Sequence, residues 1–127
     1  MRIFFLILLF FCSPSFCQIW DPVVGSTSDT QYYLDRTSIR PNGSLISYSQ
    51  MSNYPNGYKY NDKVIYSIVQ SRLTDCVGNK FKTVGMIGYS EFNGKGDIFV
   101  VSSNLDREWV LINMDKVSGE IQKEVCR

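Results

Sequence analysis

The stretch VIYSIVQSRLTDC, residues 64–76, has the β-branched and aromatic residues typical of a β-strand and ends in a cysteine. Apolar side chains occur on both of its faces, which predicts a strand that is partly covered on either side: Val64, Tyr66 and Ile68 on one face, and Ile65, Val69 and Leu73 on the other. The only later cysteine, Cys126, is the next-to-last residue of the chain. How Cys76 and Cys126 are used therefore decides how the last segment is held to the rest of the protein.

The beginning of the chain has the features of a secretory signal peptide over residues 1–17. A positive start precedes an unbroken apolar run over residues 3–11, and a turn-rich segment of small residues follows. The apolar run is shorter than the about 20 residues that a membrane-spanning helix needs. We therefore expect an exported protein whose mature chain, residues 18–127, begins after cleavage at Cys17, with cleavage after Ser15 as the alternative.

Removal of the signal peptide leaves a tyrosine-rich chain of one domain. All eight Tyr and both Trp remain, and the loss of Arg2 leaves 12 basic and 12 acidic residues. Without net charge, the mature chain has no general attraction for nucleic acid or for an anionic membrane.

We expect the side chains of both tryptophans, Trp20 and Trp109, to belong to the core. A chain of about 110 residues forms one domain, and at this size folding hides only around two-thirds of its surface, so a covalent cross-link would add useful stability.

Cys76 and Cys126 are expected to form that cross-link as a structural disulfide. In an oxidising compartment they would close a loop of about 50 residues, for which the loop-entropy model gives a stabilisation of roughly 4 kcal/mol. A metal pair and a reactive thiol are the alternatives. A metal pair would lack two further ligands in a chain with no histidine, and a reactive thiol would have no neighbouring histidine and no CxxC spacing.

The absence of histidine removes several classes of enzyme. Ser-His-Asp and Cys-His catalysis need an imidazole, and HExxH metal sites need two. Hydrolysis by a carboxylate pair needs only Asp and Glu, but the acids lie beside turn residues or opposite charges, as in Asp62-Lys63. The glycine-rich segment 85–96 lacks the GxxxxGK[ST] pattern of a phosphate-binding loop. We therefore expect no catalytic residues, no metal and no cofactor.

Strand signals dominate the mature chain and predict an α+β fold with a single antiparallel sheet of about six strands. Asn93-Gly94-Lys95-Gly96 is typical of a hairpin turn between two of them. The expected strands cover residues 19–25, 31–35, 44–53, 64–75, 81–92 and 97–102, with residues 108–112 as a further short strand.

A short helix is predicted at the C-terminus. Ser118 is suited to cap it, Ile121 and Val125 lie four residues apart on one face, and Glu120 and Lys123 have helical charge spacing. The expected disulfide would then clamp this helix across the sheet and cover one of its faces. A frayed tail is the alternative, and it would leave the two apolar residues exposed.

The segment NYPNGYKYNDK, residues 53–63, is the candidate protein-binding loop. It carries Tyr54, Tyr58 and Tyr60 with Lys59 and Lys63 among turn-forming residues. Tyrosine provides a large contact area at low entropic cost and is enriched in recognition surfaces. The alternative is that these side chains fold back as lids over the edge of the sheet.

A series of short motifs extends over nearly the whole mature chain: Trp20, Tyr32-Tyr33-Leu34-Asp35 followed by Ser38-Ile39, Asn53-Tyr54-Pro55, Tyr66-Ser67, Asp75-Cys76, Trp109 and Val125-Cys126. This series resembles the surface-adhesin protein E family of Gram-negative bacteria. The resemblance implies an antiparallel sheet packed with a helix, and a disulfide between Cys76 and Cys126. It also implies for this chain the dimerisation and the binding of host matrix and plasma proteins, such as vitronectin, laminin and plasminogen, that the best-known member of the family shows.

Two function classes follow. The first is an exported, adhesin-like binding protein of the periplasm or cell surface, which docks to a host matrix or plasma protein, or to an envelope protein, through a sheet edge or the tyrosine-rich segment. The second is a periplasmic inhibitor or immunity protein that blocks a hydrolase. The best-known family member is a lipoprotein, whereas Phe11 and Phe16 stand before Cys12 and Cys17 where a lipid-attachment signal has a small residue. We therefore expect neither a lipid anchor nor an integral membrane span.

Overall fold

The computed structural model describes residues 18–23, 25, 29–103 and 105–127, and the predicted signal peptide lies outside this part of the chain. Within these residues the chain forms seven strands, one 3-10 helix and one α-helix. They are β1 (Asp21–Pro22), β2 (Gln31–Asn42), β3 (Leu45–Tyr60), β4 (Lys63–Asp75), β5 (Lys80–Glu91), η1 (Phe92–Gly94), β6 (Lys95–Ser102), β7 (Val110–Leu111) and α1 (Val117–Val125).

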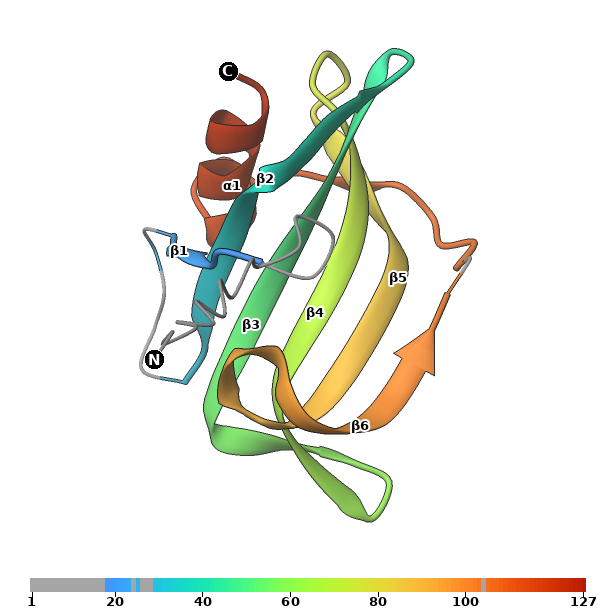
Figure 1. Cartoon of the computed structure of the whole chain (residues 1–127). Coiled ribbons are helices and arrows are strands. Elements are labelled where there is room, and N and C mark those ends of the chain that lie inside the picture. Colours follow the sequence, from blue (N-terminus) through green and yellow to red (C-terminus); the bar gives the residue numbers. More distant parts are fainter. Residues whose placement is uncertain (1–17, 24, 26–28, 104) are drawn as a thin grey trace, which may run out of the picture.

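All the strands belong to one antiparallel sheet in the order β1-β2-β3-β4-β5-β6, and β7 pairs with the start of β5 (Figure 1). This arrangement confirms the predicted single sheet with a short C-terminal helix. Each strand from β1 to β6 pairs with the next in sequence, and short turns connect β2 to β3, β3 to β4 and β4 to β5. Gly43, Asn61 and Asn79 take positive φ angles of 65°, 52° and 54° in these turns, a conformation open to Gly and, less readily, Asn.

Two strands are longer than predicted because each contains a register shift. β2 continues past Asp35 to Asn42, and β3 continues past Asn53 to Tyr60. In β2 the Asp35 carboxylate accepts hydrogen bonds from the Thr37 N–H and hydroxyl, which holds the displaced backbone. Such a bulge interrupts the alternation of inward and outward side chains, so the sequence pattern stops there although the strand does not.

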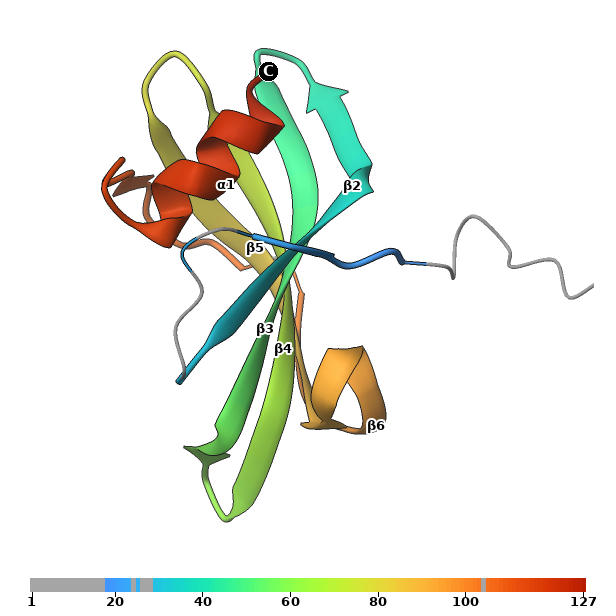
Figure 2. The ribbon, with the colours of Figure 1, turned by 90° about the vertical axis from the view of Figure 1, so that its left-hand side faces the viewer.

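The α1 helix covers the upper half of one face of the sheet, and η1 lies against the other face (Figure 2). The core between the helix and the sheet consists of Val23, Leu34, Tyr48, Ile121 and Val125. Leu34 is 0% exposed and Ile121 is 2% exposed. Burial of one such aliphatic side chain contributes about 2 kcal/mol. The predicted apolar face of the helix is thereby confirmed, and a frayed tail is excluded.

The start of α1 differs from the prediction in one respect. Lys116 occupies the N-cap position without a side-chain cap, and Ser118 lies inside the first turn. The Ser118 hydroxyl contacts the Asn113 carbonyl oxygen instead, at 3.5 Å. The predicted Ser118 cap is therefore wrong, because the N-cap position lies two residues earlier, at Lys116. The predicted charge pair is present, with Lys123 Nζ 3.4 Å from a Glu120 carboxylate oxygen.

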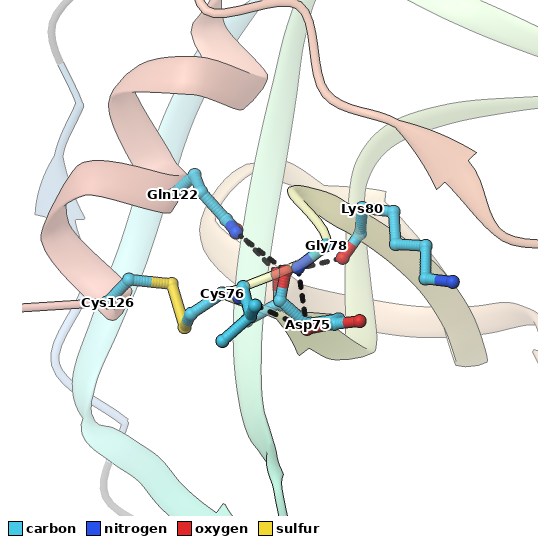
Figure 3. The surroundings of a disulfide bond; sticks show 8 residues. Asp75, Cys76, Gly78, Lys80, Gln122 and Cys126 are labelled. Carbon is cyan, nitrogen blue, oxygen red and sulfur yellow. Dashed lines mark hydrogen bonds between the residues drawn. A yellow bond between two sulfur atoms is a disulfide. The ribbon is translucent and has the colours of Figure 1, made fainter.

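The last turn of α1 is attached to the end of β4 by a disulfide between Cys76 and Cys126, whose Cα atoms are 5.8 Å apart (Figure 3). The Gln122 amide nitrogen donates to the Asp75 carbonyl oxygen at 3.3 Å. The buried Thr74 hydroxyl donates to the Gln122 amide oxygen. The predicted covalent clamp is therefore confirmed, and buried hydrogen bonds that the sequence does not reveal reinforce it.

The turn between β5 and β6 lies on the face opposite the helix. Asn53 and Asn93 are joined by two hydrogen bonds, each 2.9 Å long, and the Ser67 hydroxyl accepts from the Gly94 N–H at 2.9 Å. Ile68 and Val69, which are neighbours on β4, are 7% and 8% exposed. Both faces of the central strand are thus covered, as predicted.

The two tryptophans do not belong to the core, contrary to expectation. Trp20 and Trp109 are both half-buried. The ring of Trp109, just before β7, lies 5.3 Å from Lys80 Nζ and 5.1 Å from Lys82 Nζ. The long lysine stems and the cation–π contact hold this ring at the surface.

Candidate binding site

The tyrosine-rich segment is a β-hairpin rather than the predicted loop. We call residues 54–65 the tyrosine hairpin. Its strands pair Tyr58 with Ile65 and Tyr60 with Lys63, and Figure 1 shows it at the lower end of the sheet, beyond the η1 turn. Gly57 takes a φ angle of 76° where the register of β3 shifts, which allows the strand to resume after Pro55.

Three tyrosines of this hairpin line one hollow, which we call the tyrosine cleft. Its volume is about 310 Å³. The Tyr54 and Tyr58 rings are 5.5 Å apart between centroids and tilted by 41°. Tyr54 is half-buried, whereas Tyr58 and Tyr60 are 48% and 42% exposed. The cleft is completed by Ile65, Ile68, Gln70, Met86, Gly88, Val100 and Arg107.

Gly88 lines the cleft and, having no side chain, leaves its space open. It pairs with Ile68 across β4 and β5. A Cβ atom at this position would lie 2.9 Å from Ile65 Cδ1 and 3.4 Å from Val100 Cβ. A larger residue would therefore displace the walls and occupy the hollow.

The two lysines of the predicted site do not line the cleft. Lys59 stands between Tyr58 and Tyr60 in a paired strand, so its side chain points to the opposite side of the hairpin. Lys63 Nζ lies 4.7 Å from the centroid of the Phe99 ring on β6. The structure thus brings together Tyr54, Tyr58 and Tyr60 in the cleft, whereas Lys59 and Lys63 do not line it, although Lys63 pairs with Tyr60 across the hairpin.

The cation at the cleft is Arg107, which sequence reasoning missed. It comes from the segment between β6 and β7, which returns along β5, where the Leu105 N–H donates to the Val84 carbonyl oxygen at 3.0 Å. No local pattern marks Arg107, since only the return of the chain brings it to the cleft. Burial raises the pKa of the Tyr54 hydroxyl above its usual value, so this group stays a neutral donor at physiological pH.

A second hollow, which we call the helix cavity, lies on the same face beside the tyrosine cleft. Its volume is about 560 Å³, and it lies between the first turn of α1 and the sheet. The register aligns Gln50, Gln70 and Met86 across three strands, and these residues line one hollow or the other. Arg72 lies in the helix cavity and donates from Nη2 to Gln70 Oε1 at 2.6 Å. A lone arginine in the middle of a predicted strand was the available signal for this site.

Two further observations concern metals and membranes. Within the described residues, no group of three His, Cys, Asp or Glu side chains is placed to hold a metal ion. None of the helices in that part of the chain has the length and apolar character needed to cross a bilayer.

Comparison with known families gives a match over most of the chain. The sequence model of the family described as surface-adhesin protein E matches residues 20–127. This region contains every described strand and the helix. Among curated proteins, none matches the chain significantly.

The fold is similar to solved structures of Haemophilus influenzae protein E. One has 17% sequence identity and a TM-score of 0.64, covering 84% of this chain and 83% of the other. Its crystal form II has 17% identity and a TM-score of 0.62, covering 87% and 95%. Protein E from a non-typeable strain has 18% identity and a TM-score of 0.56, covering 84% and 80%. At these identities the likeness shows a shared fold alone.

Proposed function

The chain belongs to the surface-adhesin protein E family, and we propose that it is an exported, non-enzymatic protein that binds other proteins through the tyrosine cleft. The proposed partners are host extracellular-matrix or plasma proteins, met at the surface of a Gram-negative bacterium. Membership of an adhesin family supports the general role. The choice of surface rests on this chain's own residues.

One observation carries the choice: Tyr54, Tyr58 and Tyr60 converge on one cleft although two of them remain 48% and 42% exposed. Exposing large aromatic rings on a small domain brings no benefit to folding. Tyrosines around a hollow do provide rigid contact area with a hydroxyl at the rim, which is typical of recognition surfaces. Arg107 adds a cation, and arginine is likewise enriched at interfaces.

The edge of the sheet is the competing docking surface. β6 is the last strand in the sheet order, and Ile98 and Val101 on it are 55% and 63% exposed. An open edge of this kind can pair with a strand of another chain, including a second copy of the same protein. Its substitution therefore belongs in any test of the tyrosine cleft.

The test uses protein exported from the full-length chain and compares binding to immobilised laminin, vitronectin, plasminogen and serum albumin. We expect the Tyr58→Ala/Tyr60→Ala variant to lose at least about tenfold in affinity, as expected when two anchor aromatics are removed. Lys59→Ala is the matched control because it lies on the same hairpin but faces away from the cleft. Ile98→Lys/Val101→Lys tests the sheet edge.

The outcomes separate the surfaces and the functions. Unchanged affinity of the double tyrosine variant, with normal thermal stability, would refute the cleft as the binding surface. Loss of binding only in the β6 variant would assign docking to the sheet edge. If the wild-type protein ignores all matrix and plasma proteins but captures one hydrolase of the cell envelope and inhibits it, the inhibitor function replaces the adhesin function.

A further inference from the structure

The helix cavity contains the guanidinium of Arg72, which forms no ion pair with a carboxylate among the described residues, although Asp115 and Glu120 also line the cavity. The ion pairs in that part of the chain involve Arg36, Lys123 and Arg127, and none involves Arg72. The Arg72 guanidinium is held instead by neutral groups. It lies 4.2 Å from the centroid of the Phe81 ring and donates to Gln70 Oε1.

Two polar atoms at this place are buried and lack a hydrogen-bond partner among the described residues. They are Nε of Arg72, which is a donor, and Oε1 of Gln50, which is an acceptor. Gln50 is only 3% exposed, and both residues line the cavity. Leaving such groups unpaired costs about 1 to 3 kcal/mol each, which is a cost that a bound ligand would remove.

Burial lowers the pKa of the Arg72 guanidinium from its usual value, and the neighbouring Tyr48 hydroxyl acts in the opposite direction. The group nevertheless remains a cation at physiological pH because an arginine pKa starts so high. A fixed, partly desolvated cation with a free N–H is suited to an anion, and charge-assisted hydrogen bonds of this kind are among the strongest in proteins.

The unpaired acceptor narrows the choice of anion. Gln50 Oε1 requires an N–H or O–H donor close to the negative charge that Arg72 requires. The terminal residue of a peptide has both, since its amide nitrogen is bonded to the same Cα atom that bears its carboxylate. Phe81, Val117 and Ile121 supply apolar walls for its side chain, and about 560 Å³ is within the usual range for small-ligand sites.

We propose that the helix cavity binds an α-carboxylate together with its adjacent N–H, either at the C-terminus of a peptide or in a free amino acid. Arg72 pairs with the carboxylate, and Gln50 accepts from the N–H. This site is independent of the tyrosine cleft, although Gln70 of the cleft accepts a hydrogen bond from Arg72 of the cavity.

The test titrates the exported protein with three probes while following amide chemical shifts by NMR and the thermal midpoint. The probes are acetyl-Ala-Ala-Leu with a free carboxylate, the same peptide as its C-terminal amide, and leucine. We expect the acid to bind at least about tenfold more tightly than the amide and to raise Tm progressively as its free concentration exceeds its Kd. The largest shifts should occur at residues lining the helix cavity.

Three variants separate a ligand site from a structural role. Gln50→Leu should keep or raise Tm, because it removes an unpaired buried acceptor. It should also lower the affinity for the peptide acid at least about tenfold. Arg72→Gln should abolish the preference for acid over amide. Arg40→Gln is the matched control, since Arg40 is exposed and donates only to nearby carbonyl oxygens, and it should bind as wild type.

Each result decides the proposal. Leucine binding as tightly as the peptide acid identifies a free amino acid as the ligand, whereas peptide binding alone identifies a chain terminus. The proposal would be overturned if neither leucine nor the peptide acid bound at concentrations up to about 10 mM. Equal binding of the acid and the amide, or wild-type affinity of folded Gln50→Leu for the acid, would overturn it as well. None of these results affects the outcome for the tyrosine cleft, because Tyr58 and Tyr60 are not part of this cavity.

Discussion

The two halves of one sheet face are built in opposite ways. In the upper half, α1 covers the face and packs its own Ile121 into one cluster with Leu34 of β2, so that these side chains are 2% and 0% exposed, and a disulfide fixes the end of the helix. In the lower half, no helix covers the same strands, and Tyr58 and Tyr60 remain 48% and 42% exposed over a cleft. The upper half therefore contains the core that the helix covers, and the lower half leaves the tyrosine cleft open.

This difference explains how so small a domain combines a stable core with an open surface. A domain of this size buries a limited share of its surface, so an uncovered half reduces the apolar contribution to folding. The cross-link compensates by restricting the unfolded chain rather than by adding contacts. Substitutions should therefore change the free energy of unfolding strongly in the covered half and weakly in the open half.

The largest expected effect is removal of the cross-link. Cys76→Ser/Cys126→Ser should lower the free energy of unfolding by about 4 kcal/mol, because the freed chain regains the entropy of a loop of about 50 residues. Thermal unfolding should show a fall in Tm of at least about 10 °C. A reductant should have the same effect on the wild type and none on the variant. A fall below about 1 kcal/mol would show that buried contacts alone hold the helix.

A smaller effect is expected from the helix core. Ile121→Ala should cost about 3 kcal/mol, since it leaves a cavity beneath α1. Ile98→Ala on β6 is the matched control, because the same side chain is 55% exposed there, and its effect should stay within about 0.5 kcal/mol. Urea unfolding of both variants measures the contrast. Equal costs at the two positions would mean that the covered half is not the stable one.

The sequence was a good guide where structure follows local patterns. The alternation in residues 64–75 predicted β4, and the four-residue spacing of Ile121 and Val125 predicted the buried face of α1. The compartment and the cysteine count together predicted the cross-link. These features depend on periodicity and covalent chemistry, which a single sequence contains.

The sequence was a poor guide where structure depends on bulges and on the return of the chain. The register shift before Tyr58 turned a predicted loop into a hairpin and put Lys59 on the side away from the cleft. Arg107 joins the tyrosines from a segment about 50 residues away along the chain. Arg72 was overlooked because a charged residue within a strand does not reveal whether it faces solvent or a cavity.

A still smaller effect on stability is expected in the open half. Tyr58→Ala should change the free energy of unfolding by less than about 1 kcal/mol, because half of the side chain already contacts solvent. Tyr48→Ala in the covered half, where the ring is 4% exposed, should cost about 3 kcal/mol or more. Chemical denaturation of the pair measures the difference. A large loss with Tyr58→Ala would indicate that the tyrosines act as structural lids.

The smallest expected effect is an ion pair that joins the helix to the sheet. Glu124 on α1 accepts a hydrogen bond from Arg36 on β2, and this bond, aided by the charges of Arg127 and Arg36, lowers the pKa of the Glu124 carboxyl from its usual value of 4.5. A carboxyl whose pKa is lower in the folded state stabilises the fold above its unfolded pKa and loses that contribution as the pH falls through the folded pKa. The wild type should therefore be slightly more stable than Glu124→Gln at pH 7, and the difference should shrink below about pH 4.5.

Urea unfolding of the wild type and Glu124→Gln at a series of pH values measures this difference in the free energy of unfolding. Arg36→Gln should remove most of the dependence, leaving only the contribution of Arg127, which lies 3.1 Å from Glu124. A difference that stays constant down to pH 2.5, or one that persists unchanged with Arg36→Gln, would show that this pair does not help to hold the covered half closed.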